Sequence, residues 1–362
     1  MELFYQALMI AACTYVIWKT CDSFQTASLF LGRNMSAGTR GATINAAVSS
    51  FPELIVSLIA IFHYARDNGG AFGVFNVTGS LIYNITIIPA AMIAGCLLAG
   101  NIKKFRLPRR LVLRDIGYNL VAFALLMIMM AKGFLTFTDS VLLMGVYVFY
   151  AVWILNYPKK VEDSGKRPAK YLVNKGPKNI VKSLLDLDLY RLFFWHKREN
   201  STTAAVCVLA LDVAIFYFTC EVLVASSYAI SSILSIPSFL IAFVITAAAT
   251  SIPDTLISVK DARIGRFDDA ITQAIGTNIF NVSFCIGMPF MLYQLWYGLI
   301  DIDASINGEA MWQMMPIAAV LLVPAILIIG KNWRTKMLLL VAAYIGVLYF
   351  ALGELGGLGL TF

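Results

Sequence analysis

The stretch SSFPELIVS at residues 49–57 decides the fold, because it returns in the second half of the chain as TSIPDTLIS at residues 250–258. Both copies read hydroxyl, hydroxyl, apolar residue, proline and acid, with a serine four residues after the acid. A second motif follows each copy, GSLIYN at 79–84 and GTNIFN at 276–281, and the interval from proline to glycine is 27 residues in one copy and 23 in the other. The chain therefore contains an internal repeat.

The composition indicates that this repeat lies within a membrane. Hydrophobic residues make up 59% of the 362 residues and charged residues 14%, whereas water-soluble domains are about half apolar and about a quarter charged. Apolar runs of about 20 residues, the length that crosses a bilayer as a helix, recur along the whole chain. We therefore predict an all-α polytopic membrane protein with ten transmembrane helices. They are expected at residues 3–31, 41–63, 71–99, 112–131, 139–157, 201–226, 236–259, 270–298, 311–329 and 336–356.

A polar segment at residues 158–200 divides the ten predicted helices into two groups of five, residues 1–157 and 201–362. The part at 180–198 is amphipathic, which fits either a helix in the membrane interface or an extension of the sixth span. Because five is an odd number, the second copy enters the membrane upside down. The repeat regions 41–99 and 236–298 are then expected to form an inverted-topology pair, the plan of secondary transporters with a site at the midplane.

The chain has a net charge of +7. The distribution of its basic residues indicates how the protein is oriented in the membrane rather than nucleic-acid binding. Basic residues gather on segments that share one side of the predicted membrane, including the 158–200 linker, while the loop DIDASINGEA at 301–310 on the other side is purely acidic. The positive-inside rule then places both termini on the non-cytoplasmic side and the linker in the cytoplasm. We expect the lipid bilayer and transported ions as partners, and no nucleic acid.

The two repeated prolines predict a cation site. Proline has no amide hydrogen, so Pro52 and Pro253 each leave helix carbonyls one turn back without a donor, and a metal ion can bind such oxygens. The side chains at matched places around them carry only oxygen or amide groups. The predicted ligands are Glu53 and Asp254, with Ser49, Ser50, Thr250 and Ser251 beside them and Ser80, Asn84, Thr277 and Asn281 on the adjoining helices. Oxygen sets of this kind suit calcium, which takes about 6–8 oxygens, and fewer of them suit sodium.

Two buried carboxylates also predict exchange rather than simple binding. Glu53 and Asp254 would repel each other when empty, and one calcium, two or more sodium ions, or protons would neutralise them. A carrier that reorients only when neutral is an obligatory antiporter. No pair among the six cysteines has metal-ligand spacing, and neither His63 nor His196 has a partner in the pattern, so no zinc, copper or other cofactor is expected.

At these motifs the sequence resembles the calcium/cation antiporter superfamily, whose hallmark is a pair of inverted repeats with GTSxPE and GSNxxN/D-type motifs. TSIPDTLIS looks like the second repeat of the sodium/calcium exchangers, and GTNIFN followed by Met288 and Pro289 looks closest to the potassium-dependent branch. The resemblance implies that the central carboxylates fall on Glu53 and Asp254, and that the first and sixth spans, which carry Asp22 and Glu221, slide past the core as a gate.

Several residues depart from the family pattern. Val48 and Ala249 replace the glycine of the GTS triplet, Leu81 replaces the first asparagine of the GSN triplet, and Asn281 stands where the potassium-dependent branch carries aspartate. The central linker leaves no room for a folded regulatory domain.

The first hypothesis is therefore a sodium/calcium antiporter and not an enzyme. A proton-coupled calcium exchanger is the alternative, since protons also neutralise the two acids. Paired intramembrane acids also occur in aspartyl proteases, but the sequence has no GxGD, HExxH or GxSxG motif. A passive channel is a third possibility, which flux against a gradient would exclude.

Overall fold

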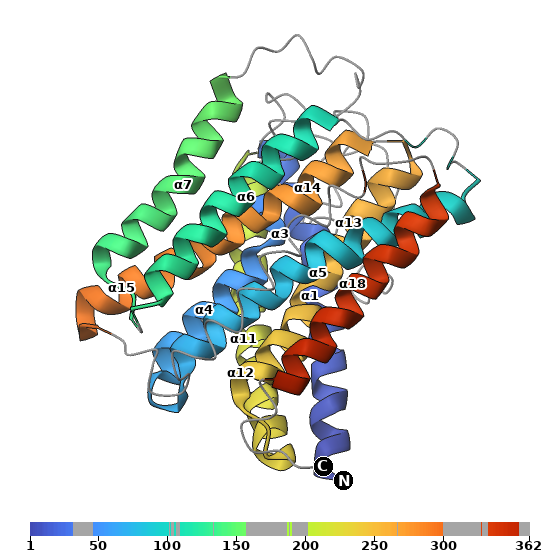
Figure 1. Ribbon diagram of the computed structural model, residues 1–362. Helices are drawn as coiled ribbons and strands as arrows, with labels where there is room; N and C mark the ends of the chain where they lie inside the picture. The colour runs from blue at the N-terminus through green and yellow to red at the C-terminus, as the bar shows by residue number, and fades with distance from the viewer. Residues whose placement is uncertain are drawn as a thin grey trace.

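The computed structural model describes residues 1–31, 46–100, 102, 105, 109–132, 134–156, 187, 189, 202–265, 267–299, 327 and 332–354. Every element in these ranges is a helix, which confirms the all-α class (Figure 1). The first half contains α1 (Glu2–Leu31), α3 (Ala46–Ser49), α4 (Phe51–His63), η2 (Ala65–Asp67), α5 (Gly69–Leu98), α6 (Arg109–Met130) and α7 (Phe137–Asn156). The second half contains α11 (Thr202–Leu234), α12 (Ser238–Ile241), η5 (Ala242–Thr246), α13 (Ala247–Arg263), α14 (Phe267–Phe280), η6 (Asn281–Ile286), α15 (Gly287–Tyr297) and α18 (Trp333–Glu354).

Seven helical segments of the described ranges are long and apolar enough to cross a membrane, which supports an integral multi-pass protein. Helix α1 is 30 residues long and coincides with the predicted first span, although it is not among these seven, and α4 is shorter, at 13 residues. The predicted span at 311–329 lies outside the described residues except for Leu327, as does the amphipathic part of the linker except for Leu187 and Leu189. The count of ten therefore stays a prediction.

The helices that carry the two copies of the repeated motif run in opposite directions. Helices α4 and α5 are joined by the short η2 helix and pack as an antiparallel hairpin. Helix α5 then runs alongside η5 and α13 in the same direction, because Gly79 lies against the Phe243 carbonyl and Gly95, further along, lies against Val259. Helix α4 is consequently antiparallel to α13, as expected for an inverted repeat.

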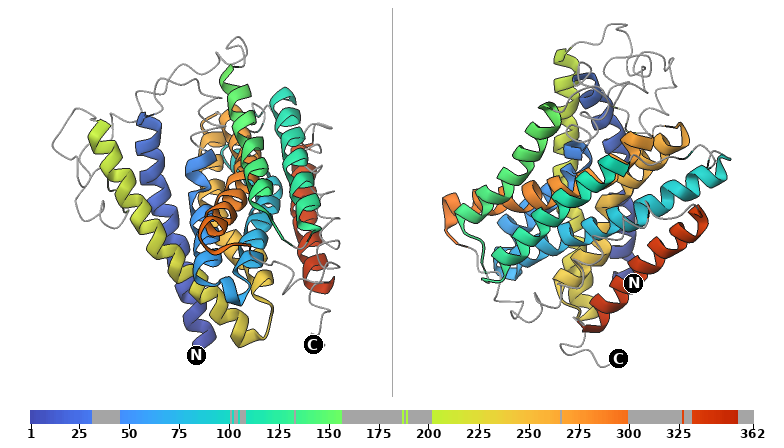
Figure 2. Two further views of the ribbon diagram at one scale, coloured as in Figure 1. Left: turned by 90° about the vertical axis from the view of Figure 1, so that its left-hand side faces the viewer. Right: turned by 45° about the horizontal axis from the view of Figure 1, so that its top comes forward.

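Helices α1 and α11 form a pair on one side of the other helices (Figure 2, left). Their most extensive contacts are with each other, and they also pack on α4 and α13. Phe24 of α1 and Phe216 of α11 form a three-ring cluster with Phe51, with ring centroids 5.3 Å and 5.9 Å from the Phe51 ring and 5.5 Å from each other. Since Phe51 directly precedes Pro52, the pair is anchored at the proline end of α4.

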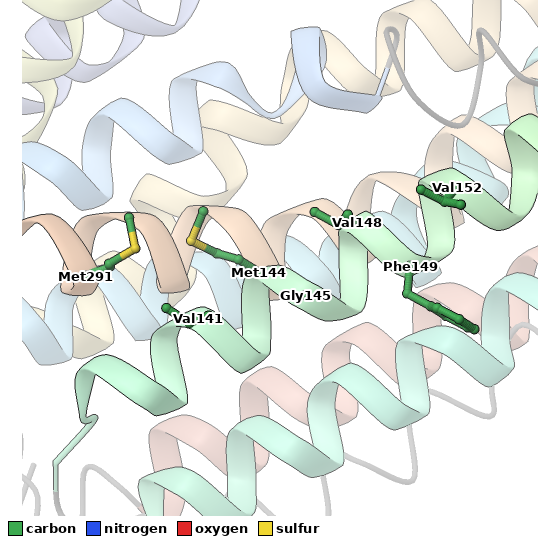
Figure 3. Close-up of a pocket in the computed structure, with 7 residues that line it drawn as sticks. All are labelled: Val141, Met144, Gly145, Val148, Phe149, Val152 and Met291. Carbon is green, nitrogen blue, oxygen red and sulfur yellow. The ribbon is translucent and has the colours of Figure 1, made fainter.

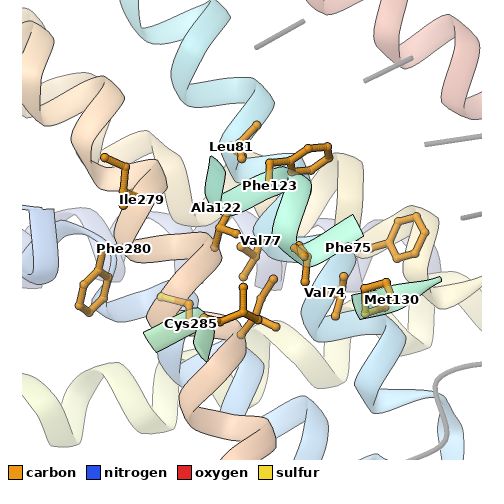
Figure 4. Close-up of a cluster of buried hydrophobic side chains, with 14 of the residues drawn as sticks. Val74, Phe75, Val77, Leu81, Ala122, Phe123, Met130, Ile279, Phe280 and Cys285 are labelled. Atoms are coloured by element: carbon orange, nitrogen blue, oxygen red, sulfur yellow. The ribbon is translucent and has the colours of Figure 1, made fainter. Parts of the chain in front are cut away.

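A cluster of apolar side chains holds the remaining helices together (Figure 4). Phe75 and Leu81 of α5, Phe123 of α6, and Ile279 and Phe280 of α14 are among its buried members. This packing fixes α5 against α14 and η6, which brings the two GxxxxN motifs together although they are almost 200 residues apart in the sequence.

Candidate functional site

The backbone at the first proline is interrupted, as the sequence predicts. Ser50, with φ −86° and ψ 3°, separates α3 from α4, and Pro52 stands in the first turn of α4, where its missing amide is tolerated. The second copy differs, because α13 continues through Pro253 and the irregular turn lies earlier, as the π-helix η5. A second π-helix, η6, begins at Asn281. Such π-turns are frequent at functional sites.

All ten side chains predicted to bind cations are fully buried. They are Ser49, Ser50 and Glu53 of the α3–α4 region, Ser80 and Asn84 of α5, Thr250, Ser251 and Asp254 of α13, Thr277 of α14 and Asn281 of η6. Within each copy the acid lies three residues after a serine, so both side chains share one helix face. The burial of this many polar side chains in one membrane protein requires partners among themselves or with a ligand.

The two carboxylates lie close to each other and to hydroxyls of the opposite repeat. Glu53 interacts electrostatically with Asp254, and its neighbouring hydroxyls are those of Thr250 and Ser251. Asp254 in turn has Ser49 beside it. Neither carboxylate accepts a hydrogen bond of normal length from any described residue. Two unneutralised acids in this environment are unstable, so they call for positive charge, which a bound cation or protons would supply.

Helix α5 joins the second repeat through two side chains of the predicted site. The Ser80 hydroxyl lies 3.4 Å from the Thr250 hydroxyl. The Asn84 side-chain amide donates to Oδ1 of Asn278 at 3.1 Å, and the Asn278 amide donates to the Leu81 carbonyl at 3.1 Å. Oδ1 of Asn84 keeps no partner among the described residues and is available to a cation.

Asn278 is a site residue that the ligand prediction did not include. Its signal in the sequence is the difference between the two copies, since Asn278 keeps the asparagine that Leu81 replaces in the first copy. The structure shows that the remaining asparagine orients the amide of Asn84 across the interface between the repeats.

The last two predicted ligands lie on the α14–η6 helix. Thr277 donates its hydroxyl hydrogen to the Gln273 carbonyl, which leaves its oxygen lone pairs for another partner. Oδ1 of Asn281 lies 3.6 Å from Sγ of Cys285, and the same sulfur lies 3.6 Å from the Ser50 carbonyl. Asn281 is therefore tied to the interrupted turn beside Glu53. The ten oxygen-bearing residues come from both repeats, on the packed elements α3, α4, α5, α13, α14 and η6.

The acids expected on the gate helices lie outside this cluster. Asp22 is exposed and Glu221 is half-exposed. Glu221 lies 3.9 Å from Nδ1 of His63, so the prediction that His63 has no partner is wrong. An exposed pair of this kind contributes little stability, about 0–1 kcal/mol.

A hollow on the surface of α7 is unrelated to the buried oxygens (Figure 3). Val141, Met144, Val148 and Val152 of α7 and Met291 of α15 are among its lining residues, and they offer no charged or hydrogen-bonding side chain. A surface of this composition is what a helix presents to lipid.

A family model matches both halves of the chain. The model of the sodium/calcium exchanger protein family matches residues 5–156 and 204–353, which are the two halves on either side of the polar linker. The chain belongs to this family. It is therefore a membrane exchanger and not an enzyme.

Relatives and solved structures show how far the similarity extends. A "putative antiporter CaxA" of Alkalimonas amylolytica is 25% identical over 94% of this chain and 96% of its own length. Sodium/potassium/calcium exchanger 1 of Bos taurus is 44% identical over 64 residues, which are 18% of this chain and 5% of that protein. Among solved structures, the H⁺/Ca²⁺ exchanger CAX matches with a TM-score of 0.61 at 14% identity, and the match covers 98% of this chain and 87% of that chain. The sodium-calcium exchanger NCX_Mj matches with a TM-score of 0.54 at 17% identity, and the match covers 95% of this chain and 97% of that chain. These structural matches support the fold.

Proposed function

We propose that this protein exchanges calcium for sodium across a membrane by alternating access to the site around Glu53 and Asp254. The observation that carries the proposal is the pair of fully buried carboxylates, supplied by antiparallel helices and without hydrogen-bond partners in the described structure. One calcium ion neutralises the pair, and so do two or more sodium ions, which makes the two cargoes compete for one site. The hydroxyl and amide oxygens of the neighbouring residues complete an oxygen set of the kind that calcium prefers.

The pairing of α1 with α11 suggests how the site is opened to each side. These two helices cover the proline end of α4 through Phe24 and Phe216, which contact Phe51, and α1 also packs on α13. A shift of the α1–α11 pair along α4 and α13 would expose the oxygens at one end and cover them at the other. The empty pair of acids opposes this shift, because the apolar faces of the moving helices would have to pass over two uncompensated charges in a low-dielectric interior.

Proton coupling is the second candidate, and the same carboxylates favour it. A buried acid without a hydrogen-bond donor is neutralised by a proton as well as by sodium. The matched solved structures include exchangers of both coupling types by their titles.

The test is calcium-45 uptake into proteoliposomes that contain the purified protein. With sodium inside and none outside at equal pH, we expect calcium uptake against its gradient. Glu53→Gln or Asp254→Asn should reduce the rate of uptake by at least about 100-fold, because the loss of a charged ligand costs about 3 kcal/mol. Asp67→Asn makes the same acid-to-amide change at an exposed residue of η2 and should leave uptake unchanged. Uptake driven by a pH gradient but not by sodium would replace the sodium hypothesis with the proton one. Uptake that survives both site substitutions would contradict the proposed site.

A further inference from the structure

The polar faces of the four central helices extend beyond the ten predicted ligands. Ser57 of α4, Asn76 of α5, Ser258 of α13 and Gln273 of α14 are buried, with at most 1% of each residue exposed. None of the oxygen and nitrogen atoms of these four side chains has a hydrogen-bond partner among the described residues. Such groups are costly in a protein interior, so each of them calls for a partner, such as an ion or a water molecule.

The four residues form two matched pairs in the repeat. Ser57 follows Pro52 by five residues, as Ser258 follows Pro253. Asn76 precedes the glycine of GSLIYN by three residues, as Gln273 precedes the glycine of GTNIFN. One carboxamide and one hydroxyl are thus placed at equivalent positions of both copies, although the surrounding residues differ.

Helix packing brings the first pair together. A Cβ on Gly73 would lie 3.6 Å from both Cα and Cβ of Ser57, so α5 touches α4 at this level. Asn76 lies three residues further along the same face of α5, about 4.5 Å along the axis, and Glu53 lies four residues before Ser57, about 6 Å away. Asn76 therefore lies between Ser57 and Glu53 along the axis of α4. We call Ser57 and Asn76 the His63-side pair, because α4 ends at His63.

The second pair lies toward the opposite end of the molecule. Helices α13 and α14 pack together as α4 and α5 do. Gly265, between α13 and α14, lies seven residues after Ser258 and eight before Gln273, so Gln273 lies between Ser258 and Asp254 along the axis of α13. Helix α13 continues beyond Ser258 to Arg263. We call Ser258 and Gln273 the Arg263-side pair. Since α4 and α13 are antiparallel, the two pairs flank the central carboxylates on opposite sides.

We propose that these pairs are two entry sites, each of which holds a monovalent cation that keeps part of its water while it moves between solution and the central carboxylates. This inference rests on the proposed exchange function. Each pair supplies only neutral oxygens, so it suits a singly charged ion held weakly and not a dehydrated divalent ion, which needs carboxylates. Equivalent positions in an inverted repeat give each side of the membrane one such site.

The test uses the sodium concentration that gives half-maximal calcium exchange, measured separately from each side of proteoliposomes. The orientation of the full-length protein is read by impermeant labelling of Asp67→Cys in η2, in a Cys207→Ser background. For Ser57→Ala/Asn76→Leu we expect this concentration to rise about tenfold on the His63 side and less than about twofold on the other, from the loss of the two oxygen ligands of the ion. Ser258→Ala/Gln273→Met should give the mirror result.

Further variants serve as controls for the double substitutions. Ser57→Ala and Ser258→Ala alone add no volume to the core and should show the same sidedness at smaller size. Thr78→Val removes a buried hydroxyl that already donates to the Val74 carbonyl, and it should alter neither side. Equal shifts on both sides, or none, would show that the pairs are structural or hold only water and would overturn the inference while leaving exchange intact. Absence of sodium-driven exchange in the unmodified protein would overturn the proposed function and this inference together.

Discussion

The two repeats place the same chemistry on different backbones. In the first copy the helix is interrupted at Ser50, two residues before Pro52, and α5 continues as a regular α-helix past Asn84. In the second copy α13 runs without interruption through Pro253, and the irregular turns are the π-helices η5 and η6 on either side of it in sequence. The polar side chains nevertheless meet between the copies.

This difference shows that side-chain spacing and backbone irregularity are separate requirements. The acid and the serine three residues before it are fixed by the period of the helix, so both copies align them on one face. The freed carbonyls can arise from a turn at proline or from a π-turn elsewhere, since either removes i→i−4 hydrogen bonds. An exchanger with two unequal halves can therefore bind with symmetric ligands and still respond differently from its two sides.

The contact that joins the halves most closely gives the largest expected effect. A Cβ on Gly79 would lie 2.1 Å from the Phe243 carbonyl oxygen, a backbone atom of the second repeat that has little room to move. We expect Gly79→Ala to destabilise the protein by about 3 kcal/mol or more, with loss of the folded monodisperse peak in detergent. Gly145→Ala is the matched control, because nothing lies within 4 Å of its Cβ, and a helix gains stability from that exchange. Equal thermal stability of the two variants would mean that α5 and η5 do not pack this closely.

Replacement of each proline tests whether the backbone difference matters for binding. Pro52→Ala restores an amide donor beside the interrupted turn, so the helix can close and withdraw carbonyl oxygens from the site. We expect the calcium concentration for half-maximal exchange to rise about tenfold, which corresponds to about 1.4 kcal/mol. Pro253→Ala, within a helix that is already continuous, should change it less than about threefold. The reverse order would break the comparison, because the second repeat would then supply the decisive carbonyls.

The features that follow from helix period and residue polarity were predictable from the sequence. The features that depend on packing between distant segments were not. The repeated motifs were enough to predict an all-α membrane protein, the antiparallel course of α4 and α13, and ten polar residues that prove to be buried. The π-turns were not predictable, since no residue type marks them as Pro52 marks the interruption near Ser50. The contacts of Asn278 and Cys285 with the site join residues that are 194 and 235 positions apart, a separation that local patterns cannot report.

The amide bridge of Asn278 is the smallest of the expected effects and the sharpest test of how the halves compensate for each other. In the first copy Leu81 offers only its backbone carbonyl, and Asn278 of the second copy both binds that carbonyl and accepts from Asn84. Asn278→Leu removes this acceptor, so the Asn84 amide can rotate and its Oδ1 no longer has a fixed direction. We expect a rise of about threefold in the calcium concentration for half-maximal exchange, close to the net worth of one hydrogen bond.

A second buried amide separates this effect from simple loss of stability. Asn119 donates to the Ile275 carbonyl at 2.8 Å and belongs to neither repeated motif. Asn119→Leu should lower the melting temperature as Asn278→Leu does, because each removes a buried side-chain hydrogen bond to a helix carbonyl, but it should not change calcium affinity. If both variants shift affinity equally, the bridge acts through general packing. If only Asn278→Leu shifts affinity, Asn278 of the second repeat aligns Asn84 of the first. The two symmetric halves of the site would then depend on a residue that differs between the copies, since Leu81 stands at the matching position.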